Sequence, residues 1–432
     1  MSASPNMTRI PVEYLEKGLY VAQLDRPWTE IPLMFQGFEI TTDEELEILR
    51  DHCSYVYVDT ERSSPDVIDE VDTLSHPSHG DPAPAAERNA APVDVASVFG
   101  EAREPDNEVF RSLVRQAYES RTRAREFVES VLSEAANGRS VDSRAASGVI
   151  EDMVSRISDN ASAALWLTSL KDKDEYTTVH SINVCILALA FGLHLGYEEQ
   201  DLQQLGVGAL LHDIGKVRTP SEILNKSEPL TPEELRIVRR HAQDGYEIVS
   251  QAGGASREVL EIIRLHHERV DGQGYPLGLV GGQIPLHVRL VALVDAYDAM
   301  TSPRQFRDPM PADQALQRLY NEADGRFGTK PVQEFIRCVG VYPVGCLVEL
   351  DNGALAIVLG QRAEARLRPT VLMVRTPAGE PYEKRLVLNL DAEPGSHEAG
   401  APRFVRRVVN PAAEGIDVTG IVAVEFGLEA AG

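Results

Sequence analysis

Cysteine is scarce in this sequence of 432 residues. The four cysteines, Cys53, Cys185, Cys338 and Cys346, are far apart and form no CxxC pair. This spacing excludes a disulfide framework and a zinc ribbon, and four free thiols suit a reducing compartment. We therefore expect the protein to work in the cytoplasm.

Long apolar runs are also missing. The most apolar stretch, residues 184–195, contains His194 and is shorter than the roughly 20 residues that cross a bilayer as a helix. The opening residues, MSASPNMTRIPVEYLEKG, lack the apolar core of a signal peptide. We expect no intrinsic membrane anchor.

Positive charge is in deficit. The chain has 42 Lys and Arg against 67 Asp and Glu, which gives a formal net charge of -25 and a pI near 4.9. Such a chain repels polyanions over most of its surface, so duplex nucleic acid is excluded as a partner. A small phosphorylated ligand is still compatible with this charge if metal ions or a local cluster of Arg and Lys reverse the field in one pocket.

The length and the apolar content predict several domains. Hydrophobic residues make up 43% of the chain, and 432 residues exceed the roughly 250 to 300 that share a single core. We predict a multidomain, mainly α protein with an all-helical central domain, a small N-terminal α/β module and a small β-rich C-terminal module. The predicted parts are 1–62 (α/β module), 63–104 (disordered linker), 105–170 (amphipathic helices), 171–340 (central domain) and 341–432 (β-rich module).

Local patterns support this division. Residues 43–52 follow threonines and begin with acids, as a capped helix does. Residues 63–94 are rich in Ser, Pro, Asp and Ala, with too few large apolar side chains to offset their ordering entropy. Apolar residues recur every three or four positions in 108–138 and 143–170, which predicts long amphipathic helices. Short apolar runs joined by the turn-forming 351–353 predict strands after 341.

Five central segments place imidazoles and carboxylates where a helical core would hold aliphatic side chains. They are DEYTTVHSINV with His180, LLHDIGK with His212, Asp213 and Lys216, HAQDG with His241, HHERVDGQGYP with His266, His267, Asp271 and Tyr275, and VDAYDAM with Asp295 and Asp298. A single histidine in such a place is more often a hydrogen-bonded core residue than a ligand. The set together indicates a shared divalent cation, because unpaired charges in contexts such as ALLHD would cost several kcal/mol.

The spacing predicts two metals. Neighbouring positions on a helix diverge by about 100°. The adjacent pairs His212-Asp213 and His266-His267 therefore cannot easily serve one ion, but they can reach two ions side by side. Binuclear sites of this kind use a bridging carboxylate and a bridging water in phosphodiester hydrolysis. From the residues alone we predict metal-assisted hydrolysis of a phosphodiester.

Three basic side chains are candidates for holding a phosphate. Lys216 follows Asp213 by three residues, so both share a face if the segment is helical; the alternative is a solvated surface lysine. Arg304 and Arg307 follow in TSPRQFR, and guanidiniums three residues apart suit bidentate phosphate binding. A charged loop face is the alternative for these two arginines.

HDIGK and HHERVDGQGYP, in this order, resemble the signature of the HD-GYP family, a subgroup of the HD-domain metal phosphohydrolases. The resemblance covers roughly residues 176–337. The N-terminal module resembles the uncharacterised domain often attached to bacterial HD-GYP proteins. The resemblance implies an all-helical HD-type catalytic domain that hydrolyses cyclic di-GMP to pGpG in bacterial signalling, and it leaves a further step to GMP open.

The resemblance also implies two divalent metals, iron or manganese. The implied ligands, with Asp213 as the bridging one, are His180, His212, Asp213, His241, His266, His267 and Asp295. Some family members add a Glu four residues before the first histidine, where this chain has Tyr176. That departure argues against a third metal, while Asp174 and Glu175 lie close in sequence.

Further residues match family positions around the metals. The resemblance implies that Asp213 and Lys216 carry the catalytic roles. The residues implied to contact the substrate are Lys216, Tyr275, Arg304 and Arg307, and those implied to support the metal ligands are Asp298 and Asp271.

Three alternatives stay open. The domain could be a catalytically idle sensor of cyclic di-GMP, a hydrolase that prefers pGpG or another cyclic dinucleotide, or a general nucleotidase of the wider HD superfamily. The sensor is disfavoured because none of the seven implied ligands is missing, and the nucleotidase leaves the GYP segment unexplained. The sequence also leaves open a homodimer or a signalling-protein partner.

Overall fold

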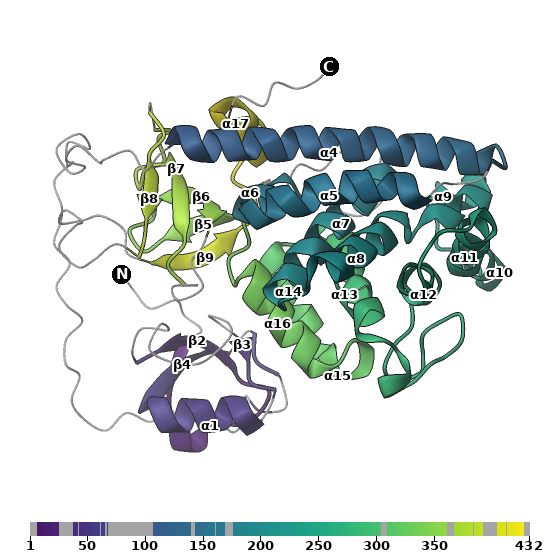
Figure 1. Ribbon diagram of the computed structural model, residues 1–432. Helices are drawn as coiled ribbons and strands as arrows, with labels where there is room; N and C mark the ends of the chain where they lie inside the picture. The colour runs from purple at the N-terminus through teal and green to yellow at the C-terminus, as the bar shows by residue number, and fades with distance from the viewer. Residues whose placement is uncertain are drawn as a thin grey trace, which may run out of the picture. The chain divides into compact units, whose positions relative to one another are not determined.

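The computed structural model describes residues 7–25, 38–41, 43–60, 62–64, 67, 107–139, 143–159, 161–168, 176–303, 309–360, 367–382, 384–391, 404–411 and 413–426 (Figure 1). Contacts gather the described residues up to position 67 in one compact unit and those from 107 onward in a second. Most of the predicted linker, 63–104, lies outside the described residues. The five domain limits stay predictions.

The first unit is a small antiparallel sheet with one helix. Its elements are β1 Met7–Pro11, the 3-10 turn η1 Val12–Tyr14, β2 Tyr20–Leu24, β3 Phe38–Glu39, α1 Asp43–His52 and β4 Tyr55–Asp59. The strands pair in the order β1-β4-β2-β3. Val56 and Val58 of β4 are fully buried while their neighbours are partly exposed, as in a strand with one face on a core. The predicted α/β module is confirmed.

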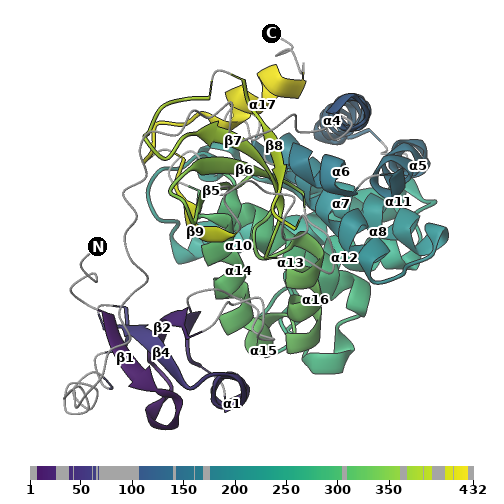
Figure 2. The ribbon, with the colours of Figure 1, turned by 90° about the vertical axis from the view of Figure 1, so that its left-hand side faces the viewer.

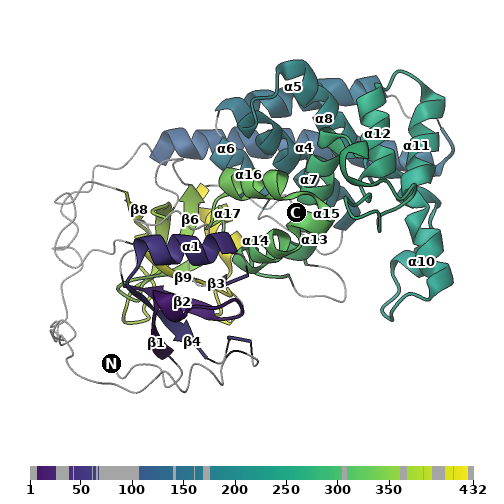
Figure 3. The same ribbon diagram turned by 90° about the horizontal axis from the view of Figure 1, so that it is seen from below.

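The second unit is mainly helical (Figures 1 and 3). Its long helix α4, Asn107–Ala136, packs along α5 Ser143–Asp159 and α6 Ala161–Leu167, and Figure 2 looks along α4 and α5 lying side by side. The central helix is α7, Tyr176–His194, which contacts α4, α5, α6, α8, α13 and α16. The other helical segments are α8 Glu199–Leu211, η3 Ile214–Arg218, α9 Ser221–Leu224, α10 Pro232–Arg239, α11 His241–Ala252, α12 Arg257–Leu265, η4 Gly281–Gln283, α13 Leu286–Thr301, α14 Ala312–Asn321, α15 Ala323–Arg326 and α16 Thr329–Val339.

The predicted helix over 143–170 is divided in the structure. α5 ends at Asp159 and α6 begins at Ala161, so two helices replace one. A periodicity of apolar residues predicts a helical stretch but does not show where it is interrupted.

α7 has no exposed polar face along most of its length, because other helices surround it. Its window Thr177–His194 is long and apolar enough to cross a membrane, yet 83% of that window is buried inside the structure. Phe191 and Cys185 on this helix are both fully buried. Such burial is typical of a core helix, and it explains the absence of a polar face.

The β-rich module is a five-stranded antiparallel sheet. Its strands are β5 Leu347–Leu350, β6 Leu355–Gly360, β7 Thr370–Arg375, β8 Val387–Asn389 and β9 Val405–Val409, in the order β8-β7-β6-β5-β9. The predicted turn joins β5 to β6, and Gly353 adopts a φ of 88° there, which glycine allows without strain. Trp166 of α6 and Val114 of α4 belong to the apolar core of this sheet. The module thus packs on the helical body, together with a helix that was not predicted, α17 Val418–Phe426.

A close approach of α8 and α12 gives a test of this packing. Gly208 lies on α8, and a Cβ atom there would come within 2.5 Å of Ile262 Cδ1 and 2.9 Å of Ile262 Cβ. Replacing Gly208 with Ala should therefore force the two helices apart and destabilise the protein by about 1–3 kcal/mol.

Gly148→Ala is the matched control for this substitution. Gly148 lies on α5 with no neighbouring atom within 4 Å of an added Cβ, so alanine there should raise stability by up to about 1 kcal/mol. Thermal unfolding followed by circular dichroism compares the two variants. A midpoint for Gly208→Ala equal to or above that of the wild type would contradict the described contact.

Candidate metal centre

Helices α7, α11 and α13 and the segments after α8 and α12 bring the seven predicted ligands together. α7 contributes His180, the segment after α8 contributes His212 and Asp213, the start of α11 contributes His241, the segment after α12 contributes His266 and His267, and α13 contributes Asp295. Two groups have ligand atoms within 4.8 Å of one another: His241, His266 and His267 form one, and His180, His212 and Asp213 form the other.

In the first group, imidazole nitrogens converge. The Nδ1 atoms of His241 and His266 donate to the carbonyl oxygens of Val238 and Ile263 at 2.7 and 3.0 Å. Each Nε2 therefore carries a lone pair, and that of His241 lies 3.3 Å from Nε2 of His266 and 3.2 Å from Nε2 of His267. Metal–nitrogen bonds of about 2.0–2.1 Å set ligand nitrogens at roughly this separation. A shared cation would turn these facing lone pairs from a repulsive arrangement into a favourable one.

In the second group, one buried nitrogen has no partner. His212 is fully buried and its Nδ1 donates to the carbonyl of Ala209 at 2.7 Å. Its Nε2 lies 3.3 Å from Asp213 Oδ2, but among the described residues it has no hydrogen-bond partner. Leaving such an acceptor unsatisfied costs about 1–3 kcal/mol. This orphaned nitrogen fits a metal ligand.

Asp213 lies between the two groups. Its Oδ1 is 3.4 Å from Nε2 of His241, while its Oδ2 is 3.3 Å from Nε2 of His212 and 2.5 Å from the ammonium of Lys216. The side chain is only 3% exposed. One carboxylate thus faces both groups with different oxygens, the geometry that a bridging ligand requires.

Asp298 orients His180 from behind. The Nδ1 of His180 donates to Asp298 Oδ2 at 2.7 Å, which turns Nε2 toward Asp295 at 3.0 Å. Asn183 and Ser302 also donate to Asp298, at 3.1 and 2.9 Å. A carboxylate behind a ligating imidazole fixes both its tautomer and its direction. Neither Asn183 nor Ser302 was identified from the sequence, because their role depends on a contact between α7 and the end of α13.

The electrostatics of the site favour positive charge at its centre. Burial disfavours the charged form of His180, but hydrogen bonds to Asp295 and Asp298 outweigh it and raise its pKa to about 9. Burial lowers the pKa of His266 and lowers that of His267 to about 3. Two imidazoles are therefore neutral near pH 7, whereas the carboxylates around His180 attract a positive charge, which a divalent cation would supply.

Asp213 and Asp295, the two carboxylates among the predicted ligands, stay ionised. Burial works against the charge on Asp213, yet the adjacent Lys216 holds its pKa well below the usual range. For Asp295, burial is likewise outweighed by the hydrogen bond to His180, and its pKa is lowered. Both residues are thus present in the form that binds metal.

The loop after His267 carries a buried carboxylate that the sequence analysis missed. Glu268 is 2% exposed and accepts backbone N–H bonds from Leu277, Gly278 and Leu279 at 2.6, 3.2 and 2.9 Å. A buried charge requires such donors. The position of Glu268 directly after two histidines within a glycine-rich segment was the one available signal.

Tyr275 lies against the imidazoles. Its ring centroid is 4.7 Å from that of His267, and its N–H donates to the carbonyl of His267 at 3.2 Å. The Tyr275–Pro276 peptide bond is cis. Gly274 permits this path, because a Cβ there would lie 2.4 Å from the backbone nitrogen of Arg269. A residue without a Cβ is therefore needed at this position.

Of the remaining predicted residues, the structure describes Lys216 and Asp271. Lys216 lies on the 3-10 helix η3 rather than on a regular α-helix, and its ammonium contacts Asp213 directly. Asp271 pairs with Arg269 and accepts from the N–H of Gln273, contacts that shape the loop. Arg304 and Arg307 lie outside the described residues, as do Asp174 and Glu175.

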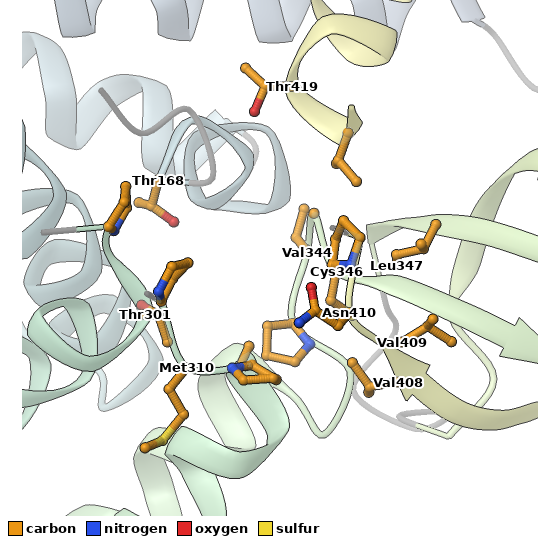
Figure 4. A pocket seen from close by; sticks show the side chains of 18 of the residues that line it. Thr168, Thr301, Met310, Val344, Cys346, Leu347, Val408, Val409, Asn410 and Thr419 are labelled. Carbon is orange, nitrogen blue, oxygen red and sulfur yellow. The ribbon is translucent and has the colours of Figure 1, made fainter. Parts of the chain in front are cut away.

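A cavity of about 440 Å³ lies elsewhere in this unit, between the end of α13 and the β-rich module (Figure 4). Thr301, Met310, Leu347 and Val409 are among its lining residues. Asp298 also lines the cavity. The seven predicted ligands are all among the described residues, and none of them lines it. Asp298, which accepts a hydrogen bond from His180, is thus shared by the cavity lining and the surroundings of the predicted ligands.

Known proteins resemble both units of the chain. Residues 153–330 match the family described as HD domain, and residues 7–146 match a domain of unknown function, DUF3391. Cyclic di-GMP phosphodiesterase PA4108 of Pseudomonas aeruginosa is 34% identical over 84% of this chain and 84% of its own length. With 367 matched residues, the similarity extends into both family regions.

Two further relatives match shorter spans. The cyclic di-GMP phosphodiesterase response regulator RpfG of Xanthomonas campestris is 39% identical over 41% of this chain and 44% of its own length. The 3'3'-cGAMP-specific phosphodiesterase 1 of Vibrio cholerae is 33% identical over 41% of each chain. With the buried histidine and aspartate groups and the similarity over 84% of the chain together, the chain belongs to the HD-GYP family of HD-domain proteins and carries an N-terminal DUF3391 domain.

Proposed function

We propose that this chain is a phosphodiesterase that hydrolyses cyclic di-GMP to pGpG, with GMP as the product of a further step. The observation that carries the proposal is the pair of buried ligand groups joined by Asp213. The similarity over 84% of the chain to a protein named as a cyclic di-GMP phosphodiesterase supports the same substrate.

The residues present fit two divalent metals. We propose that His241, His266 and His267 hold one metal, that His180 and His212 hold the other with Asp295, and that Asp213 bridges them. Mixed imidazole and carboxylate ligands suit iron, manganese, nickel or zinc. From the family resemblance we propose iron or manganese. Metals bound there would polarise phosphoryl oxygens and make water nucleophilic near neutral pH.

Lys216 is the described cation best suited to the substrate phosphate. Its ammonium contacts the buried Asp213 while 22% of its side chain is exposed, so it extends from the ligand groups toward solvent. A phosphate beside Asp213 would accept a hydrogen bond from the same ammonium. We propose from the family resemblance that Arg304 and Arg307 bind the other phosphate oxygens.

Another cyclic dinucleotide is the second candidate substrate. A relative 33% identical to this chain is named as specific for 3'3'-cGAMP, and the ligand groups themselves would bind a phosphodiester rather than a base. The idle-sensor alternative is less favoured, because all seven predicted ligands lie together.

We propose that the enzyme acts in the cytoplasm, which suits its free cysteines.

Replacing Asp213 with Ala should remove metal and turnover together. The change leaves His212 and His241 without their common carboxylate, and turnover should fall about a thousandfold or more. The protein is loaded anaerobically with iron or manganese, its metal content is measured by mass spectrometry, and pGpG and GMP are followed by chromatography. Asp201→Ala, at an exposed position of α8, is the control. Retention of both metals and full turnover by Asp213→Ala would refute the bridging role.

Replacing Lys216 with Ala should spare the metals and slow the reaction. We expect both metals to stay bound and turnover of cyclic di-GMP to fall about a hundredfold, because one charged donor to the phosphate is lost. Lys226→Ala is the control. The ammonium of Lys226 pairs with Glu234 Oε2 at 2.7 Å, and neither residue belongs to the ligand groups. Steady-state kinetics and metal analysis test both variants. Loss of metal, or kinetics equal to the wild type, would contradict the assigned role.

Replacing Glu268 with Gln should loosen the turn at Leu277–Leu279 without loss of metal. The glutamine would face one of the three N–H donors with its own NH2 group, which costs about 1.5–3 kcal/mol. We expect a lower unfolding midpoint and a lower kcat/KM. Glu247→Gln, which alters a surface pair with Arg218, is the control. If Glu268→Gln matched the wild type in both measurements, the carboxylate would not be what holds the turn.

A further inference from the structure

In the described segment from η3 to the start of α11, one basic side chain has no acidic partner among the described residues. Six Lys and Arg residues lie between η3 and the start of α11, and five of them form ion pairs. The pairs are Lys216 with Asp213, Arg218 with Glu247, Lys226 with Glu234, Arg236 with Glu233, and Arg240 with Asp244. The sixth residue is Arg239 at the end of α10, which is exposed and pairs with no acceptor in the described part of the chain.

Arg239 contacts an aromatic ring instead. Its guanidinium carbon lies over the ring of Tyr275, 5.1 Å from the centroid, and that ring is 4.7 Å from the ring of His267. A guanidinium over a tyrosine face is held by a cation–π interaction that leaves its N–H donors unused. The Arg239 guanidinium therefore presents a positively charged fork, meaning two parallel N–H donors, beside the predicted ligands. Arg239 is only two residues before His241.

The two parallel N–H donors of the Arg239 guanidinium suit guanine rather than adenine. The Hoogsteen edge of guanine presents two acceptors, O6 and N7, that an arginine binds with two parallel hydrogen bonds. The same edge of adenine presents one acceptor and one donor, which the fork cannot satisfy. A phosphate would also suit it, but the phosphate has Lys216 and the ligand groups, and none of those groups reads a base.

We propose that Arg239, positioned by Tyr275, reads the O6 and N7 edge of a guanine whose nucleotide phosphate lies at the metal centre. This inference rests on the proposed function, because it takes a guanine nucleotide as the ligand. It makes Arg239 a determinant of base specificity in an otherwise base-indifferent site. Tyr275 then acts as the support that directs the guanidinium.

GMP and AMP test the inference, because they carry the same phosphate and differ in the base. Their affinities are measured by titration calorimetry on the full chain loaded with manganese, with the metal content of each sample determined. We expect the wild type to bind GMP about tenfold more tightly than AMP. Arg239→Ala should weaken GMP binding by about the same factor and leave AMP binding unchanged.

Two further variants distinguish the effect of the paired N–H donors from the effect of the positive charge. Arg239→Lys keeps the positive charge but loses the two parallel donors, so it should also lose the preference for GMP. Arg236→Ala removes a charge one turn earlier on α10, where the side chain is 73% exposed and pairs with Glu233. This control should bind both nucleotides as the wild type does.

Several outcomes would overturn the inference. Equal weakening of GMP and AMP in Arg239→Ala would assign Arg239 to the phosphate, and a GMP preference that persists in Arg239→Ala or Arg239→Lys would assign the reading elsewhere. A wild type without preference would also refute it. Turnover of cyclic di-GMP in the same samples tests the proposed function separately: a protein that binds GMP through Arg239 but cleaves no cyclic di-GMP refutes that function and leaves guanine reading intact.

Discussion

A buried carboxylate surrounded by imidazole nitrogens is the constraint on which this structure depends. Asp213 is almost fully buried, and a charge in such a place is tolerated only when opposite charge or hydrogen-bond donors compensate it. The helices must therefore meet at this point. Gly215 shows how closely they do so, since a Cβ there would lie 1.9 Å from the carbonyl oxygen of His241. The glycine in HDIGK is thus a packing requirement of the site.

Helix ends supply the imidazoles in a repeated way. His212, His241 and His266 each follow or end a helix, and each donates Nδ1–H to the carbonyl oxygen of the residue three positions earlier. The last carbonyls of a helix lack partners within it, so this bond satisfies one of them. It also directs Nε2 away from the helix and into the site. One hydrogen bond therefore both caps the helix and orients the ligand.

This local character explains what the sequence could predict. The ligands in HDIGK and HHERVDGQGYP are oriented by contacts within their own segments, so short motifs were enough to identify them. Asn183 and Ser302 act instead through Asp298, which α13 brings to α7 across more than a hundred residues. No periodicity encodes that contact. Glu268 was missed for the same reason, because its donors come from a loop that must first fold back.

The metal centre and base recognition place opposite demands on the chain. The ligand groups need burial, which keeps most of the imidazoles neutral and leaves their nitrogens available for cations. A base reader needs exposed donors, and in an acidic chain with a net charge of -25 most guanidiniums in this region are engaged by carboxylates. A guanidinium held by an aromatic ring avoids this competition, because the ring fixes its direction while its hydrogen-bond donors stay available. Tyr275 meets both demands, since it contacts His267 as well as Arg239.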